Sequence, residues 1–168
     1  EYQPYDDMRS INWKATARTG DLKVNQKNYT LLQTIRIFFN LEDTGILKKT
    51  EAVEASIRIV AGLASFFLNQ GIRVSCCGNG RDILHGEPVR IEAGAGAGQM
   101  QQIYRALARI DANSETADFI ECFEQTLFSG DSGTMTLFVS PNAYDGFVEL
   151  ISHYRQKGRE CLWFYPIP

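Results

Sequence analysis

Short apolar segments that alternate with amphipathic segments along most of the chain constrain its fold more than any other feature. Residues 34–41, Thr-Ile-Arg-Ile-Phe-Phe-Asn-Leu, are rich in β-branched and aromatic side chains and contain neither glycine nor proline, which predicts a buried strand. Similar short runs predict further strands at residues 72–77, 88–92, 134–139 and 161–165.

Amphipathic helices are predicted between these strands. From Thr50 onward apolar side chains recur every three or four residues, and Gly71 is suited to end that helix. Further helices are predicted at residues 99–110, 116–128 and 143–157. Because strands alternate with helices, we expect an α/β fold: a doubly wound, mostly parallel, Rossmann-like sheet with helices on both faces.

Charge and composition exclude several classes of partner. The 168 residues suit one domain with its own core, and 17 basic against 20 acidic side chains give a net charge of −3. Since no basic cluster stands out, we expect neither nucleic acid nor a membrane surface as the direct partner of this fragment. The four cysteines lack metal-ligand spacing and no signal peptide is present, which predicts reduced thiols in a cytoplasmic protein.

Four loops are expected to meet at the carboxyl ends of the strands, where open α/β sheets bind their ligands. They are residues 40–49, 78–82, 93–98 and 140–144. The candidate binding residues in these rim loops are Asn40, Glu42, Asp43, Thr44, Gly98, Ser140 and Asn142.

Oxygen-bearing side chains at alternate positions after the first long strand allow two interpretations. Asn40, Glu42 and Thr44 could offer oxygen ligands to Mg²⁺, with Asp43 supplying a further charge. The alternative is a loop whose polar groups are only solvated, and spacing alone leaves both open.

Neither the glycines nor the histidines form a complete catalytic motif. Gly94, Gly96 and Gly98 precede a helix, but their spacing lacks the third glycine of a dinucleotide-binding turn, which favours a simple turn over a phosphate cradle. His85 and His153 accompany no nucleophile signature. No catalytic residue is therefore assigned.

The first 28 residues differ in character from the domain predicted at 29–168. Two adjacent acids, two arginines and a tryptophan lie within eighteen residues. Such groups can form bidentate ion pairs and an aromatic anchor that clamp the segment to a domain, or a cluster that binds a partner. The motif cluster comprises Asp6, Asp7, Arg9, Asn12, Trp13 and Arg18.

The run Glu-Tyr-x-Pro-x-Asp-Asp-x-Arg-x-Ile-x-Trp-x-Ala-x-Ala-Arg, from Glu1 to Arg18, resembles the bacterial domain-of-unknown-function family fifty-eight. The resemblance implies a doubly wound sheet of the von Willebrand factor A type, encoded beside MoxR-type AAA ATPases and acting with them in assembly, maturation or stress functions. Full-length members often carry membrane helices before this motif. We therefore expect Glu1 to begin an excised domain whose parent is tethered to the cytoplasmic membrane.

The resemblance also implies where a metal would bind. Von Willebrand factor A domains hold a metal with Asp-x-Ser-x-Ser after the first strand, and the matching positions here read Asn40-Leu41-Glu42-Asp43-Thr44. The two later loops of that site also deviate, at Gly98-Gln99 and at Ser140-Pro141-Asn142. We expect a degenerate metal site and no cofactor, with Glu42, Asp43 and Thr44 as weak Mg²⁺ candidates.

Together with the family resemblance, these patterns predict a non-catalytic protein-interaction module rather than an enzyme. Its rim would dock a protein partner such as an AAA ATPase, with Ile46 and Tyr144 as candidate apolar anchors. The alternative is a metal- or phosphate-dependent hydrolase that uses the same rim. A third possibility is a scaffold for flanking regions.

Overall fold

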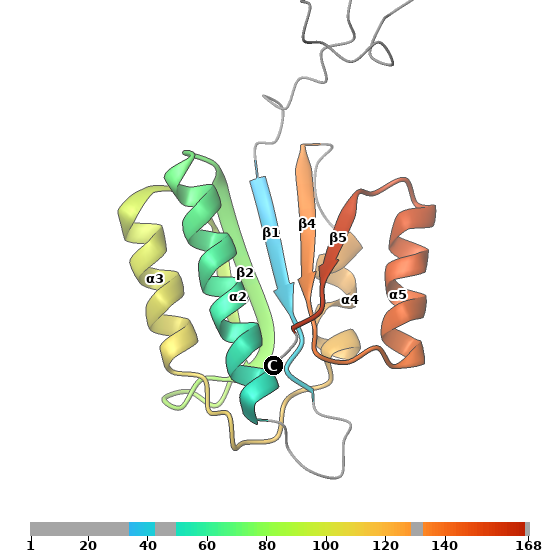
Figure 1. The fold of residues 1–168 in the computed structure, drawn as a ribbon, viewed down its shortest axis with the longest axis horizontal. Helices are drawn as coiled ribbons and strands as arrows, with labels where there is room; N and C mark the ends of the chain where they lie inside the picture. Colours follow the sequence, from blue (N-terminus) through green and yellow to red (C-terminus); the bar gives the residue numbers. More distant parts are fainter. Residues whose placement is uncertain (1–33, 43–49, 129–132, 167–168) are drawn as a thin grey trace, which may run out of the picture. The chain divides into compact units, whose positions relative to one another are not determined.

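The computed structural model describes residues 34–42, 50–128 and 133–166, and in these ranges helices surround a five-stranded sheet (Figure 1). The strands and helices are β1 (Thr34–Phe39), α2 (Thr50–Asn69), β2 (Arg73–Arg81), β3 (Pro88–Gly94), α3 (Gly96–Ala108), α4 (Phe119–Phe128), β4 (Thr134–Val139), α5 (Asp145–Gln156) and β5 (Cys161–Phe164).

The sheet is mixed, in the order β3-β2-β1-β4-β5. β1 pairs in parallel with β2 and β4, and β4 pairs in parallel with β5. Only β3 is antiparallel, because a short hairpin joins it to β2. The predicted α/β class is confirmed.

Side chains of β1 alternate between two separate hydrophobic cores. Ile35, Ile37 and Phe39 belong to a core with residues of α2 and α3. Phe38 belongs to a second core with aromatic side chains from α4, β4 and α5. Because successive strand residues point to opposite faces, the consecutive apolar residues Ile37, Phe38 and Phe39 are what a strand buried on both faces requires. Figure 1 shows α2 and α3 side by side, with α4 and α5 across the strands from them.

Helix α2 begins and ends where its sequence predicts. Val53, Val60, Ala64 and Leu68 are buried, at the spacing of one helix face. After the last turn, Gly71 adopts φ +75°, and its N–H donates to the Leu68 carbonyl at 3.0 Å. A glycine suits this left-handed position because a Cβ is disfavoured there.

The glycine tract lies at the amino ends of the parallel strands, whereas it was predicted at their carboxyl ends. Since β3 runs antiparallel, Gly94 pairs with Val74 near the start of β2, and Gly98 lies in the first turn of α3 rather than in the rim. The placement of Gly98 among the rim loops was therefore wrong. The tract makes a compact turn instead: Gln99 Nε2 donates to the Val74 and Glu92 carbonyls at 2.9 and 2.8 Å.

Two of the differences from the predicted element boundaries bear on the carboxyl edge of the sheet. β2 continues through the Gly-Asn-Gly sequence, because pairing with β3 extends to Arg81. Helix α4 begins at Phe119 rather than residue 116, because Asp118 caps its first turn by accepting a hydrogen bond from the Glu121 N–H at 2.8 Å. Residues 109–118, the α3–α4 loop, are thereby free to approach the carboxyl edge of the sheet.

Candidate functional site

The candidate site lies at the carboxyl ends of β1, β2 and β4. Phe39, the last residue of β1, is in register with Gly78 of β2 and Val139 of β4. Asn40 continues this register, since its N–H donates to the Val139 carbonyl at 2.8 Å. Asn40 and Ser140 therefore follow neighbouring strands at the point where the strand order reverses, the usual ligand position in open α/β sheets.

A buried pair of amides joins β1 to β2 at this edge. Asn79 Nδ2 donates to Asn40 Oδ1 at 2.8 Å, and Asn79 Oδ1 accepts from the Leu41 N–H at 2.8 Å. Asn79 Nδ2 also donates to the Ala117 carbonyl at 3.0 Å, and the Ala117 N–H returns a bond to the Asn79 carbonyl at 3.1 Å. Both asparagine residues are fully buried. Asn79 thus holds three segments of chain together.

The Glu42 carboxylate is bonded within the protein. Its Oε1 accepts from the N–H of Phe119, the first residue of α4, at 2.8 Å, and its Oε2 accepts from Asn40 Nδ2 at 3.3 Å. The N–H of Glu42 donates to Asn40 Oδ1 at 2.9 Å. A carboxylate at a helix N-terminus satisfies an otherwise unbonded N–H group and interacts favourably with the helix dipole. Glu42 therefore stabilises the start of α4.

The segment after β4 closes the other side of this network. Asn142 Nδ2 donates to the Glu42 carbonyl. The buried Ser140 hydroxyl donates to the Asn142 carbonyl at 2.9 Å, and Trp163 Nε1 donates to the Ser140 carbonyl at 3.3 Å. Asn40, Glu42, Ser140 and Asn142 thus meet as predicted, and they bond to one another and to the backbone.

Tyr144 packs beside this network rather than projecting from it. Its ring lies 6.1 Å from that of Phe147, and it belongs to the second hydrophobic core. Burial, together with a hydrogen bond to the Glu42 carboxylate, raises the pKa of Tyr144 well above its usual value. The phenol stays neutral at physiological pH and contributes to the local packing.

The described residues do not fit a von Willebrand factor A metal site. Among the candidate rim residues that the structure describes, Glu42 alone carries a carboxylate, and both of its oxygens already accept hydrogen bonds. A divalent cation would have to displace these bonds. In the described part of the chain, no group of three or more His, Cys, Asp or Glu side chains is arranged to hold a metal.

Several predicted residues lie outside the described ranges. These are the metal candidates Asp43 and Thr44, the candidate anchor Ile46, and the whole motif cluster of Asp6, Asp7, Arg9, Asn12, Trp13 and Arg18. Their predicted roles stay predictions.

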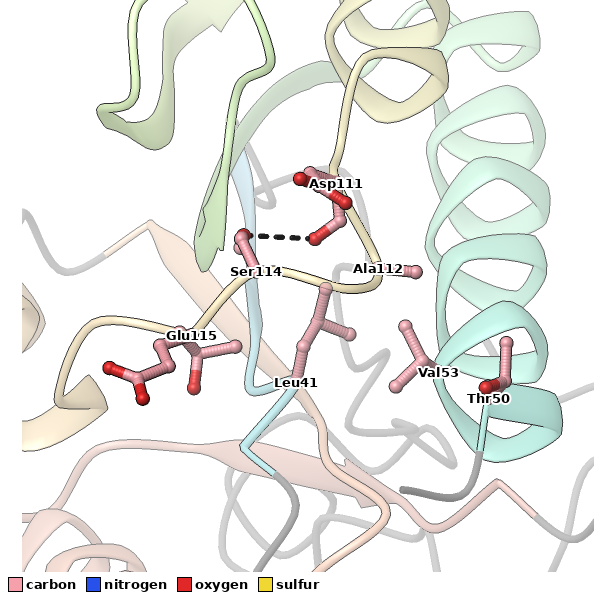
Figure 2. A pocket seen from close by; sticks show the side chains of 9 residues that line it. Leu41, Thr50, Val53, Asp111, Ala112, Ser114 and Glu115 are labelled. Carbon is pink, nitrogen blue, oxygen red and sulfur yellow. Dashed lines mark hydrogen bonds between the residues drawn. The ribbon is translucent and has the colours of Figure 1, made fainter.

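A pocket of about 290 Å³ opens beside the network, where Leu41 and Gly80 face the first turn of α2 and the α3–α4 loop. Figure 2 shows Leu41 between the first turn of α2, with Thr50 and Val53, and the α3–α4 loop. The loop is held by its own bonds, among them Ser114 Oγ to the Asp111 carbonyl at 3.1 Å. The lining combines apolar and polar side chains: Leu41, Thr50, Val53, Gly80, Asp111, Ala112, Ser114, Glu115 and Thr116.

The sequence prediction includes Asn79 in the rim loop 78–82 without naming it as a candidate residue, and it leaves the α3–α4 loop out of the site. The predicted helices 99–110 and 116–128 take in both ends of this loop, and between them the sequence Asp-Ala-Asn-Ser is typical of turns in which side chains bond nearby backbone. The signal for Asn79 was an amide between two glycines directly after a buried apolar strand. Both features indicate polar side chains that bond the backbone at the carboxyl edge of the sheet.

The fold and the site define an α/β domain with a closed polar network and an adjoining pocket at the carboxyl edge of its sheet. Residues 1–140 match the family model "Protein of unknown function DUF58", and the chain belongs to this family. The resemblance in Glu1–Arg18 is thereby confirmed. A comparison with curated proteins found no match. In the described ranges, no helix is both long and apolar enough to cross a membrane.

Proposed function

We propose that this domain is a non-catalytic protein-interaction module that docks a protein partner at its carboxyl edge. The partner we propose is a MoxR-type AAA ATPase, with which the module would act in assembly or maturation at the cytoplasmic side of a membrane. The observation that carries the proposal is the pocket between the first turn of α2 and the α3–α4 loop, next to a rim whose polar groups are already bonded. Polar groups that already bond one another leave few free for a reacting substrate, whereas the adjoining pocket can receive a side chain of a protein partner.

We also propose that the fold is doubly wound and of the von Willebrand factor A type. The order β3-β2-β1-β4-β5 supports this, since it matches the first five strands of the common doubly wound arrangement. The two cores on opposite faces of the sheet give further support. In such folds ligands bind where the strand order reverses, between β1 and β4 here. That position is closed by the bond from Asn142 to the Glu42 carbonyl.

A degenerate metal site is part of the proposal. Titration of the purified chain with millimolar Mg²⁺ or Mn²⁺ is expected to give no heat beyond dilution, because Glu42 would have to release the Phe119 N–H and Asn40 Nδ2. Isothermal titration calorimetry makes the measurement. Millimolar or tighter binding that disappears in Asp43→Ala would contradict this expectation and restore the metal-dependent hydrolase as the better interpretation.

The absence of a catalytic step is likewise proposed. Catalytic nucleophiles need a lowered pKa or an adjacent base. Burial instead raises the pKa of the Cys76 thiol, which lies in the first hydrophobic core. In the rim, the Ser140 hydroxyl donates to a backbone carbonyl rather than to a base.

The docking proposal is tested by filling the pocket. Ala112→Arg is expected to weaken binding of the purified MoxR-type ATPase about tenfold or more, because the new side chain occupies the space between Leu41 and Val53. The matched control is Ala97→Arg, an exposed position in the first turn of α3 at the opposite edge of the sheet. Biolayer interferometry measures both. If the parent chain fails to bind the ATPase, this partner is wrong; if Ala112→Arg binds like the parent, the pocket is not the contact.

A further inference from the structure

Two adjacent aliphatic side chains project from the tip of the hairpin between β2 and β3. Ile83 and Leu84 are each 63% exposed. In the described part of the chain, neither belongs to a hydrophobic core. Turns of this kind are usually built from Gly, Pro, Asn, Asp and Ser, so two aliphatic residues at the tip are not explained by the turn itself.

Asp82 holds this tip rigidly. Its N–H donates to the Glu87 carbonyl at 3.0 Å, and its own carbonyl accepts from the Gly86 N–H at 2.7 Å. Its Oδ1 accepts from the Leu84 N–H at 2.8 Å, and its Oδ2 lies 2.9 Å from Arg109 Nε. All four polar groups of one buried residue are thus used to shape the loop.

The tip is also tied to the end of α3. The Ile83 N–H donates to the Arg109 carbonyl at 2.9 Å, and the backbone of Asp82 pairs with that of Ile110 in an isolated antiparallel β-bridge. Exposed apolar side chains on a fixed backbone lose little conformational freedom when a partner covers them. Preorganisation of this kind is what raises affinity at binding anchors.

Arg81 connects the tip to the pocket described above. Its Nη1 donates to the Gly86 carbonyl at 2.8 Å and its Nε donates to the Glu115 carbonyl at 3.1 Å. One guanidinium therefore spans from the hairpin to a segment that lines the pocket. The knob formed by Ile83 and Leu84 and the hollow at the carboxyl edge belong to one continuous surface.

Among the residues that the structure describes, the charges around this surface are predominantly negative. Asp82 and Arg109 neutralise each other. Glu87 and Glu115 are exposed, and Asp111 lines the pocket. Three carboxylates against one guanidinium favour a partner with basic side chains and disfavour an anionic bilayer.

We propose that Ile83 and Leu84 form the apolar anchor of the docking surface and insert into an apolar pocket, rimmed by basic side chains, on a protein partner. The proposal rests on the proposed function and adds the residues and the partner chemistry to it. Anchors of this type carry most of the binding free energy of an interface, while the residues around them exclude water.

The double substitution Ile83→Ser with Leu84→Ser tests the anchor. Because both side chains are largely exposed, the melting temperature is expected to stay close to that of the parent chain. Binding to the purified MoxR-type ATPase is expected to weaken about 30-fold or more. The matched control is Phe66→Ser on α2, which removes an apolar side chain that is 59% exposed away from this surface and should leave affinity unchanged.

Each result has a distinct meaning. Loss of binding in the double variant alone, with unchanged melting, supports the anchor. Binding that survives the double substitution overturns the anchor and leaves the proposed function standing. Failure of the parent chain to bind the ATPase overturns both. Co-sedimentation of the parent chain with vesicles of anionic phospholipid, lost in the double variant, would overturn the protein partner in favour of a bilayer.

Discussion

Replacing Asn79 by alanine is expected to lower the free energy of unfolding by about 3 kcal/mol, because several buried groups lose their partners together. The Leu41 N–H, Asn40 Oδ1 and the Ala117 carbonyl all bond to the Asn79 side chain. Asn79 itself is fully buried, so water cannot replace these bonds without entering the structure. Urea denaturation followed by circular dichroism measures the change.

The matched control for this variant is Asn69→Ala. Asn69 is exposed at the end of α2 and donates only to the Ser65 hydroxyl, at 3.4 Å. Its replacement is expected to change stability by less than about 0.5 kcal/mol. A similar small change in Asn79→Ala would mean that the buried amide pair does not hold the edge of the sheet together.

Replacing Gly78 by alanine is expected to destabilise the chain by about 3 kcal/mol or more, because a methyl group there meets an aromatic ring in a closed core. Gly78 is in register with Phe39, and an added Cβ would overlap that ring at Cδ2, Cε2 and Cζ. Phe39 is fully buried against residues of α2 and α3, so it can turn away only by displacing its neighbours. Thermal and urea unfolding measure the loss.

Gly62→Ala is the control for this second substitution. Nothing lies within 4 Å of a Cβ built at Gly62, which is exposed in the middle of α2. Alanine there is expected to raise stability by about 0.5–1 kcal/mol, because glycine is a poor helix former. If Gly78→Ala left the stability unchanged, the close approach of β1 and β2 would be looser than the structure shows.

The amino-acid pattern was sufficient for the α/β class and for the position of most elements. The apolar run 34–41 and the helical spacing after Thr50 each depend on local sequence and on burial, and both predictions are confirmed. The direction of β3 was not evident from its composition. A short hairpin joins β3 to β2, and two strands joined in this way pair antiparallel. Because β3 runs antiparallel, Gly98 lies at the amino ends of the parallel strands rather than at their carboxyl ends.

The candidate site was predictable in its residues and not in its bonding. Asn40, Glu42, Ser140 and Asn142 follow strands that end at one edge, and the order of strands is enough to bring them together. That Glu42 would stabilise the start of α4 depends on a helix that begins 77 positions further along the chain. No local pattern announces such a bond, so a carboxylate at this position resembled a metal ligand.

The bonds of the rim have a consequence for how the chain reaches its native state. Glu42 bonds residues 77 and 100 positions away, and Asn79 bonds Asn40 across 39 positions. Contacts between such distant segments form late, because long loops must close before they contribute. A nascent or truncated chain that ends before residue 142 therefore lacks a complete rim. A partner that recognises this edge would distinguish finished molecules from unfinished ones by shape alone.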